Sequence, residues 1–109
     1  MSLDSIELHD AVLKGMEINV ATDTISISLD YYPNGNNSRQ RCPANIRFEG
    51  VSQHSQIADF AELKSNARAG NIVSWAPSPT QGTTFIYLAR GLISVTAQLC
   101  HFISAEESA

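Results

Sequence analysis

Apolar and polar residues alternate along two neighbouring stretches near the start of the chain. In the second stretch, 24–32, serines separate Ile25, Ile27 and Leu29, which is the period of two expected of a half-buried β-strand. The first stretch, 8–20, has the same period over its second half, and a short polar segment joins the two. This pattern predicts a β-hairpin.

Similar alternation predicts four further strands. In the first of them Ile46 and Phe48 face inward, and Gly50 near its end is typical of a bulge. The last two are separated only by a short turn at Arg90 and Gly91, so they predict a second hairpin. These four strands cover 45–51, 71–76, 84–90 and 93–99.

One stretch, 55–69, has the spacing of an amphipathic helix. Apolar residues and a lysine stem recur there every three or four positions, which would place them in one stripe. Ser55 is the expected N-cap, and Gly70 is expected to adopt the left-handed conformation that follows a helix. The stripe consists of Ile57, Phe60, Ala61, Lys64 and Ala67.

The resulting order β-β-β-α-β-β-β predicts an α+β fold with about six mainly antiparallel strands and one helix. Residues 1–109 are expected to form a single domain, because one domain typically has this length. One helix covers only part of such a sheet. We therefore expect the sheet to curl into a sandwich or an open barrel, or to cover its far face with a second chain.

Composition and charge narrow the class of protein. Hydrophobic residues make up 43% of the chain and charged residues 17%, as in a globular domain. The formal net charge of −4 disfavours binding to nucleic acid and to anionic membrane surfaces. The stretch 92–103 is too short and polar to span a bilayer, and residues 1–10 lack a secretory signal pattern. We therefore expect a cytoplasmic protein in which Cys42 and Cys100 are free thiols.

Side chains with catalytic or metal-binding chemistry are scattered along the sequence. The histidines and cysteines lack the close spacing typical of zinc sites, and the glycines form no phosphate-binding loop. Neighbouring residues on a strand point to opposite faces, so we expect no ion pair between His9 and Asp10. The sequence thus predicts no catalytic group, no metal and no cofactor, and it favours a protein that is not an enzyme.

Several polar and aromatic residues are candidates for contact with a partner. Arg39, Arg41 and Arg47 concentrate positive charge, which suits an acidic partner, a phosphate or simply a solvated loop. Trp75 would serve as an interface anchor or as part of the core. Tyr32 stands at a strand end beside the turn-rich loop. The candidate binding residues are His9, Asp10, Tyr32, Arg39, Arg41 and Trp75.

Four short motifs carry a resemblance to known proteins. They are Leu-His-Asp-Ala at 8–11, Phe-Glu-Gly-Val at 48–51, Gly-Asn-Ile at 70–72 and Tyr-Leu-Ala-Arg-Gly at 87–91. This pattern resembles a family of small uncharacterised bacterial proteins with a domain of unknown function. Some proteins with a similar layout are grouped with the immunity proteins of bacterial toxin systems. The resemblance implies a bacterial protein that works by binding, and it supplies no catalytic residue.

Three functional hypotheses follow. The first is a non-enzymatic protein-interaction module, of immunity or inhibitor type, in which sheet edges and the loop 33–43 meet another protein. The alternative is a small-ligand-binding or enzymatic domain with a pocket inside the curled sheet. The third is a homodimer that covers an exposed sheet face, and it is compatible with the first. The pocket of the alternative would take its polar contacts from His9, His54, His101 and Cys100.

Overall fold

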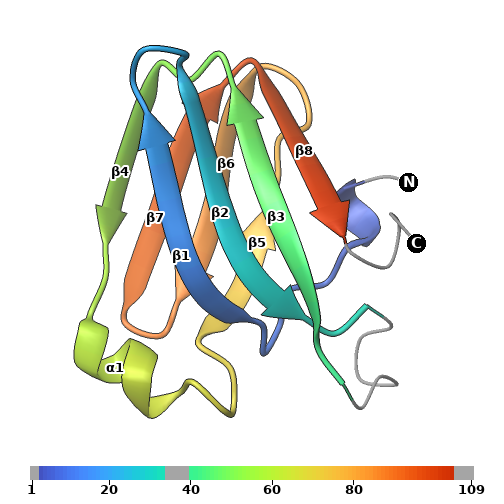
Figure 1. Ribbon diagram of the computed structural model, residues 1–109, viewed down its shortest axis with the longest axis vertical. Helices are drawn as coiled ribbons and strands as arrows, with labels where there is room; N and C mark the ends of the chain where they lie inside the picture. The colour runs from blue at the N-terminus through green and yellow to red at the C-terminus, as the bar shows by residue number, and fades with distance from the viewer. Residues whose placement is uncertain (1–2, 34–39, 105–109) are drawn as a thin grey trace.

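The computed structural model describes residues 3–33 and 40–104 and shows two four-stranded sheets packed face to face (Figure 1). One sheet has the strand order β1-β2-β3-β8 and the other β4-β7-β6-β5. All neighbouring strands are antiparallel. The elements are a 3₁₀ turn (Leu3–Ser5), β1 (Val12–Asn19), β2 (Thr24–Tyr31), β3 (Cys42–Glu49), β4 (Gln53–Ile57), α1 (Phe60–Ser65), β5 (Ile72–Ala76), β6 (Gly82–Leu88), β7 (Gly91–Ala97) and β8 (Leu99–Ser104).

Both predicted hairpins are confirmed. β1 and β2 form the first, with Ile18 opposite Ile25, and β6 and β7 form the second, with Ile86 opposite Ile93. The inward residues of the predicted third strand are also confirmed, because Ile46 is fully buried in β3. Gly50 lies just beyond this strand, in a left-handed conformation with φ of 67°.

Alternate residues of the two sheets meet in one apolar core. Strands β2 and β3 contribute inward side chains at every second position, as do β6 and β7 from the opposite sheet. The burial of these side chains is the main stabilising contribution to the fold. The largest fully buried apolar residues are Leu8, Ile25, Ile27, Leu29, Ile46, Phe48, Ile72, Ile86, Ile93 and Val95.

The helix prediction is wrong in its extent. Helix α1 spans only Phe60–Ser65, and its N-cap is Asp59, whose carboxylate accepts a 3.1 Å hydrogen bond from the Glu62 amide. Ser55 lies in β4, where it pairs with β7, and Gly70 lies beyond the end of the helix. Pairing with β7 gives the backbone of 53–57 hydrogen-bond partners on one side of the strand, so tertiary contacts override the helical spacing of this segment.

The described residues form eight strands rather than the predicted number of about six, in two packed sheets that do not close into a barrel. Strand β4 was missed because its sequence, Gln-His-Ser-Gln-Ile, is polar on both faces. Strand β8 was missed because the predicted strand 93–99 absorbed its first residue. β7 in fact ends at Ala97, and the chain turns at Gln98 before it returns to the opposite sheet as β8.

Candidate functional site

The turn before β1 holds the first two candidate residues and corrects one expectation. His9 and Asp10 lie in a turn, where Asp10 has a φ of 66°, and so they do not point to opposite faces. The His9 Nε2 atom lies 3.6 Å from an Asp10 carboxylate oxygen, and both side chains are about half exposed. The other ring nitrogen, Nδ1, lies 3.0 Å from the carbonyl oxygen of Val73 in β5. The pair therefore borders the junction between β1 and β5.

Arg41 reaches the same junction and is held by main-chain acceptors. Its Nε donates to the carbonyl oxygen of Asp10 at 3.1 Å, and its Nη2 donates to that of Arg68 at 2.8 Å. The guanidinium also lies 4.7 Å from the centroid of the Tyr32 ring, a cation–π geometry. Because these contacts tie three chain segments together, the observed role of Arg41 is to join them.

The remaining candidates are Trp75 and Arg39. Trp75 is half-buried on β5, packs against the core and donates from Nε1 to the carbonyl oxygen of Ile6 at 2.9 Å. Its ring also lies 6.0 Å from that of Phe102, so the contacts of Trp75 are those of a residue that packs on the core. Arg39 and most of the predicted loop 33–43 lie outside the described residues. The structure thus links His9, Asp10, Tyr32 and Arg41 by direct contacts, whereas Trp75 contacts Ile6 and Phe102.

The polar residues of the alternative pocket do not converge. His54 lies on β4 and His101 on β8, at opposite sides of the molecule (Figure 1). The His101 Nε2 atom instead lies 2.7 Å from a carboxylate oxygen of Glu49 on the outer surface. Cys100 is buried in the core, and its burial raises the pKa of the thiol to about 11, despite a hydrogen bond with Thr84. Both cysteines are free, as expected.

The outer face of the sheet β4-β7-β6-β5 is the second candidate for a binding surface. Residues directly opposite each other in neighbouring strands point to the same side of a sheet. Since Ile86 and Ile93 are buried, their neighbours in sequence mark the outward positions. No charged side chain occurs at any outward position of these four strands, all of which the structure describes. The outward residues are Gln53, Ser55, Ile57, Ser74, Ala76, Thr83, Phe85, Tyr87, Leu92, Ser94 and Thr96.

The outer face of the other sheet, β1-β2-β3-β8, has a different character. It carries two separate pairs of ionisable groups: the Lys14 Nζ lies 3.6 Å from an Asp30 carboxylate oxygen, and His101 pairs with Glu49. Arg47 also points outward there and is exposed. The chain carries 18 acidic and basic residues in all, from 7 Lys and Arg plus 11 Asp and Glu. None of those that the structure describes stands at an outward position of β4, β7, β6 or β5, and this distinguishes the face from the outer face of the other sheet.

Two kinds of side chain make up the uncharged face. Phe85 and Tyr87 on β6 are 37% and 42% exposed, and their rings stack with centroids 6.4 Å apart. Around them, hydroxyl groups pair across strands: the Thr83 and Thr96 oxygens are 2.7 Å apart. The Ser55 hydroxyl makes an equally short contact on the β4 side. The face thus combines exposed aromatic surface with hydroxyl groups that donate and accept hydrogen bonds.

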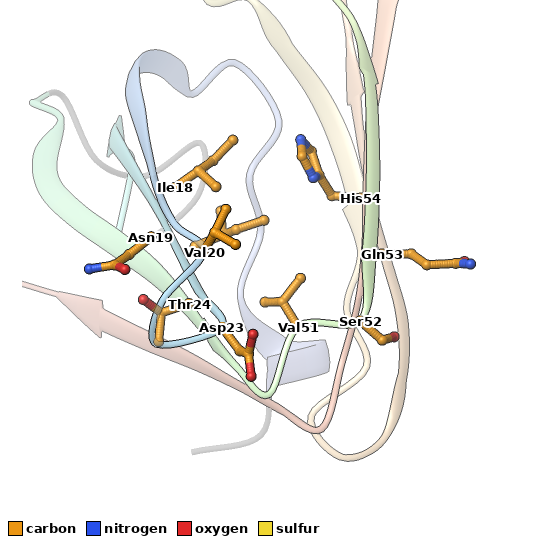
Figure 2. A pocket seen from close by; sticks show the side chains of 10 residues that line it. Ile18, Asn19, Val20, Asp23, Thr24, Val51, Ser52, Gln53 and His54 are labelled. Atoms are coloured by element: carbon orange, nitrogen blue, oxygen red, sulfur yellow. The ribbon is translucent and has the colours of Figure 1, made fainter.

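A groove opens along one side of the sandwich, between the edge strands β1 and β4. Near the β1–β2 turn it forms a hollow of about 240 Å³, where Ile18 and His54 flank the opening and Gln53 points away (Figure 2). Towards α1 a second hollow of about 290 Å³ lies between Met16 and Phe60. Both hollows are lined mainly by apolar groups. We call the two together the edge groove.

The described residues contain no group of three or more His, Cys, Asp or Glu side chains arranged to hold a metal ion. None of the described helices is long and apolar enough to cross a membrane. Comparisons with protein-family models, curated proteins and solved structures find no match. The resemblance to immunity proteins therefore stays a prediction.

The uncharged face escaped prediction although its signal is present in the sequence. In the second hairpin, Thr83, Phe85 and Tyr87 alternate with buried residues, as do Ser94 and Thr96 on the following strand. Outward positions of an exposed strand usually include charged residues, so their absence over two paired strands is the informative feature. A sequence search for clusters of charged residues and for single aromatic residues overlooks this absence of charge.

Proposed function

We propose that the protein is a non-enzymatic protein-interaction module that binds its partner through the uncharged outer face of the sheet β4-β7-β6-β5. The observation that carries this proposal is the absence of charge at every outward position of the four strands, combined with the exposed Phe85–Tyr87 stack. The cores of protein interfaces are depleted in charged residues and enriched in aromatic ones.

The chemistry of the face also defines the partner. Desolvation of a charged group is costly, whereas an uncharged face loses little on leaving water. The Ser94 hydroxyl pairs with that of Ser55, and the Thr96 hydroxyl with that of Thr83. Each hydroxyl retains hydrogen-bonding capacity after this pairing. The matching surface is therefore an uncharged protein surface with exposed apolar groups and hydrogen-bonding side chains. The charged face is suited to remain in solvent.

Affinity capture from a native lysate tests this proposal when the tagged chain is compared with a variant. Phe85→Glu places a charge in the middle of the face at a position that is already 37% exposed, so the fold should be retained. The original chain should capture a partner that binds the face. The amount captured by the variant should be lower by at least about tenfold, because a buried unpaired charge is costly.

The matched control is Ser28→Glu, which adds the same charge at an exposed outward position of β2 on the charged face. This variant should capture the partner as the original chain does. Equal capture by the Phe85 variant, or loss with the Ser28 variant alone, would show that the uncharged face is not the contact surface.

A further inference from the structure

We propose that β4 is a docking edge that pairs antiparallel with β4 of a second copy of this chain. The inference goes beyond the proposed function, since it concerns the edge of the sheet rather than its face. β4 pairs on one side only, with β7, so alternate residues of 53–57 direct backbone N–H and C=O groups away from the sheet. Such unpaired groups are a template for another strand.

The other three sheet edges are protected, each by a device that hinders pairing. β1 has a register shift between Leu13 and Gly15, with Lys14 at the irregular position. β5 has a similar shift, and residues ahead of β1 cover its edge: the Asp10 amide donates to the Ile72 carbonyl oxygen at 3.0 Å. The edge of β8 is met by the connector before β6, whose Pro79 carbonyl oxygen lies 3.4 Å from the Cys100 nitrogen.

β4 has none of these devices. Its sequence, Gln-His-Ser-Gln-Ile, contains no proline, lysine or acidic residue, its pairing with β7 is regular, and all five side chains are exposed. Proteins usually protect an edge strand with a charge, a proline or a bulge. A regular, uncharged, exposed edge is therefore the place where a second chain can add a strand at lowest cost.

The sequence of β4 also fits a two-fold axis, as a homodimer requires. In an antiparallel register centred on Ser55, this residue stands opposite its own counterpart. Gln53 then faces the counterpart of Ile57, and His54 faces the counterpart of Gln56. No like charges meet, serine hydroxyls pair across the axis, and an imidazole faces an amide with which it can hydrogen-bond. A net charge of −4 opposes self-association, but no residue of β4 contributes to it.

Exposed apolar side chains at both ends of β4 would be buried by this pairing and would stabilise the dimer further. Ile57 and Phe60 at one end are 74% and 68% exposed, and Val20 near the other end is 82% exposed. Antiparallel pairing brings Ile57 and Phe60 of one copy towards Val20 of the other copy. Residues along the edge groove, including Ile18, lie beside β4 and then lose solvent contact. The pairing joins two uncharged faces into one continuous surface.

Sedimentation velocity over about 5 μM to about 500 μM tests the proposal directly. The short strand predicts a weak dimer, since small interfaces are generally weak, so the mass should rise from 11.8 kDa towards twice that value. Ser55→Lys and Ser55→Glu each place like charges opposite each other and should weaken self-association by about tenfold or more. An equal mixture of the two variants should restore the dimer, because opposite charges then meet.

Ser94→Lys is the matched control, because Ser94 lies directly opposite Ser55 on the inner strand β7 and points outward from the same face. It should leave self-association unchanged. Ser55→Cys provides a second readout, since it should form a disulfide-linked dimer on mild oxidation, whereas Ser94→Cys should not. A monomer at every concentration, or a dimer that the Ser55 variants do not affect, would overturn the inference. Neither result bears on partner capture through Phe85.

Discussion

Gly70 lies so close to Asp10 that no other residue fits at its position. A Cβ atom added at Gly70 would lie 2.5 Å from the Asp10 Cα and from its carbonyl oxygen, and Gly70 has a φ of 117°. Hydrogen bonds next to this contact hold the two segments together, because the amides of Asn71 and Ile72 both donate to the Ala11 carbonyl oxygen. Two of the four resemblance motifs, at 8–11 and 70–72, therefore meet in a structural joint between the sheets.

Gly70→Ala should destabilise the fold by about 2–4 kcal/mol, since it adds both a backbone strain and a steric overlap. Thermal or denaturant unfolding measures this change. The matched control is Gly15→Ala, because a Cβ at Gly15 would meet nothing within 4 Å. We expect this control to leave stability unchanged or to raise it by about 0.5 kcal/mol. Similar stability of the two variants would contradict the tight contact at Asp10.

Asn71 is buried and connects three elements through its side chain. Its Oδ1 accepts from the Leu13 amide at 2.7 Å, and its Nδ2 donates to the Leu63 carbonyl oxygen at 3.1 Å. Asn71→Ala leaves both main-chain groups without this partner and should lower the free energy of unfolding by about 2–4 kcal/mol. Denaturant titration measures the loss. Asn45→Ala, at a partly exposed site with a 3.4 Å bond, should cost less than about 0.5 kcal/mol.

Arg41 should behave as a structural residue. Arg41→Lys removes the planar fork that reaches the carbonyl oxygens of Asp10 and Arg68, so we expect a loss of about 1 kcal/mol in unfolding free energy. Capture of the partner should be unaffected once the variant is folded. If a stably folded Arg41→Lys chain lost the partner, the contact surface would instead include the junction of β1 and β5. Arg47→Lys, at an exposed strand position, serves as the control.

Cys100 should give the protein a pH-dependent stability at alkaline pH. Burial raises the pKa of its thiol from 9.0 to about 11, so the folded state holds this proton more tightly than the unfolded chain does. The stabilising contribution is complete below pH 9 and is lost as the pH rises towards 11. The slope of unfolding free energy against pH over this interval should therefore be less negative in Cys100→Ala. Identical slopes would contradict the burial of the thiol.

Much of the fold follows from the sequence where local and tertiary preferences agree. Both hairpins alternate with period two, and the structure has them as predicted, with Ile27 and Ile93 on the inner faces. The prediction failed at 55–57, because the helical spacing there competes with pairing to β7, a contact distant in sequence. It failed again at β8, where Gln98 turns the chain without a glycine or proline signal.

The candidate site was harder to predict than the fold. Single polar residues such as Arg41 attract attention in a sequence, yet its donors are used by main-chain carbonyl groups. The part of the uncharged face on β6 and β7 has a signal in the sequence, but its extension over β4 and β5 emerges only when the strand order is known. Strand order depends on long-range packing and therefore cannot be read from periodicity alone.

Hydroxyl-radical footprinting of the free chain and of its captured complex tests the central claim most directly, because it reports the solvent exposure of individual aromatic side chains. If the uncharged face binds the partner, oxidation of Phe85 and Tyr87 should fall in the complex. Oxidation of Tyr32, beside the junction of β1 and β5, should not change. Unchanged oxidation of Phe85 and Tyr87 in a stoichiometric complex would contradict the account.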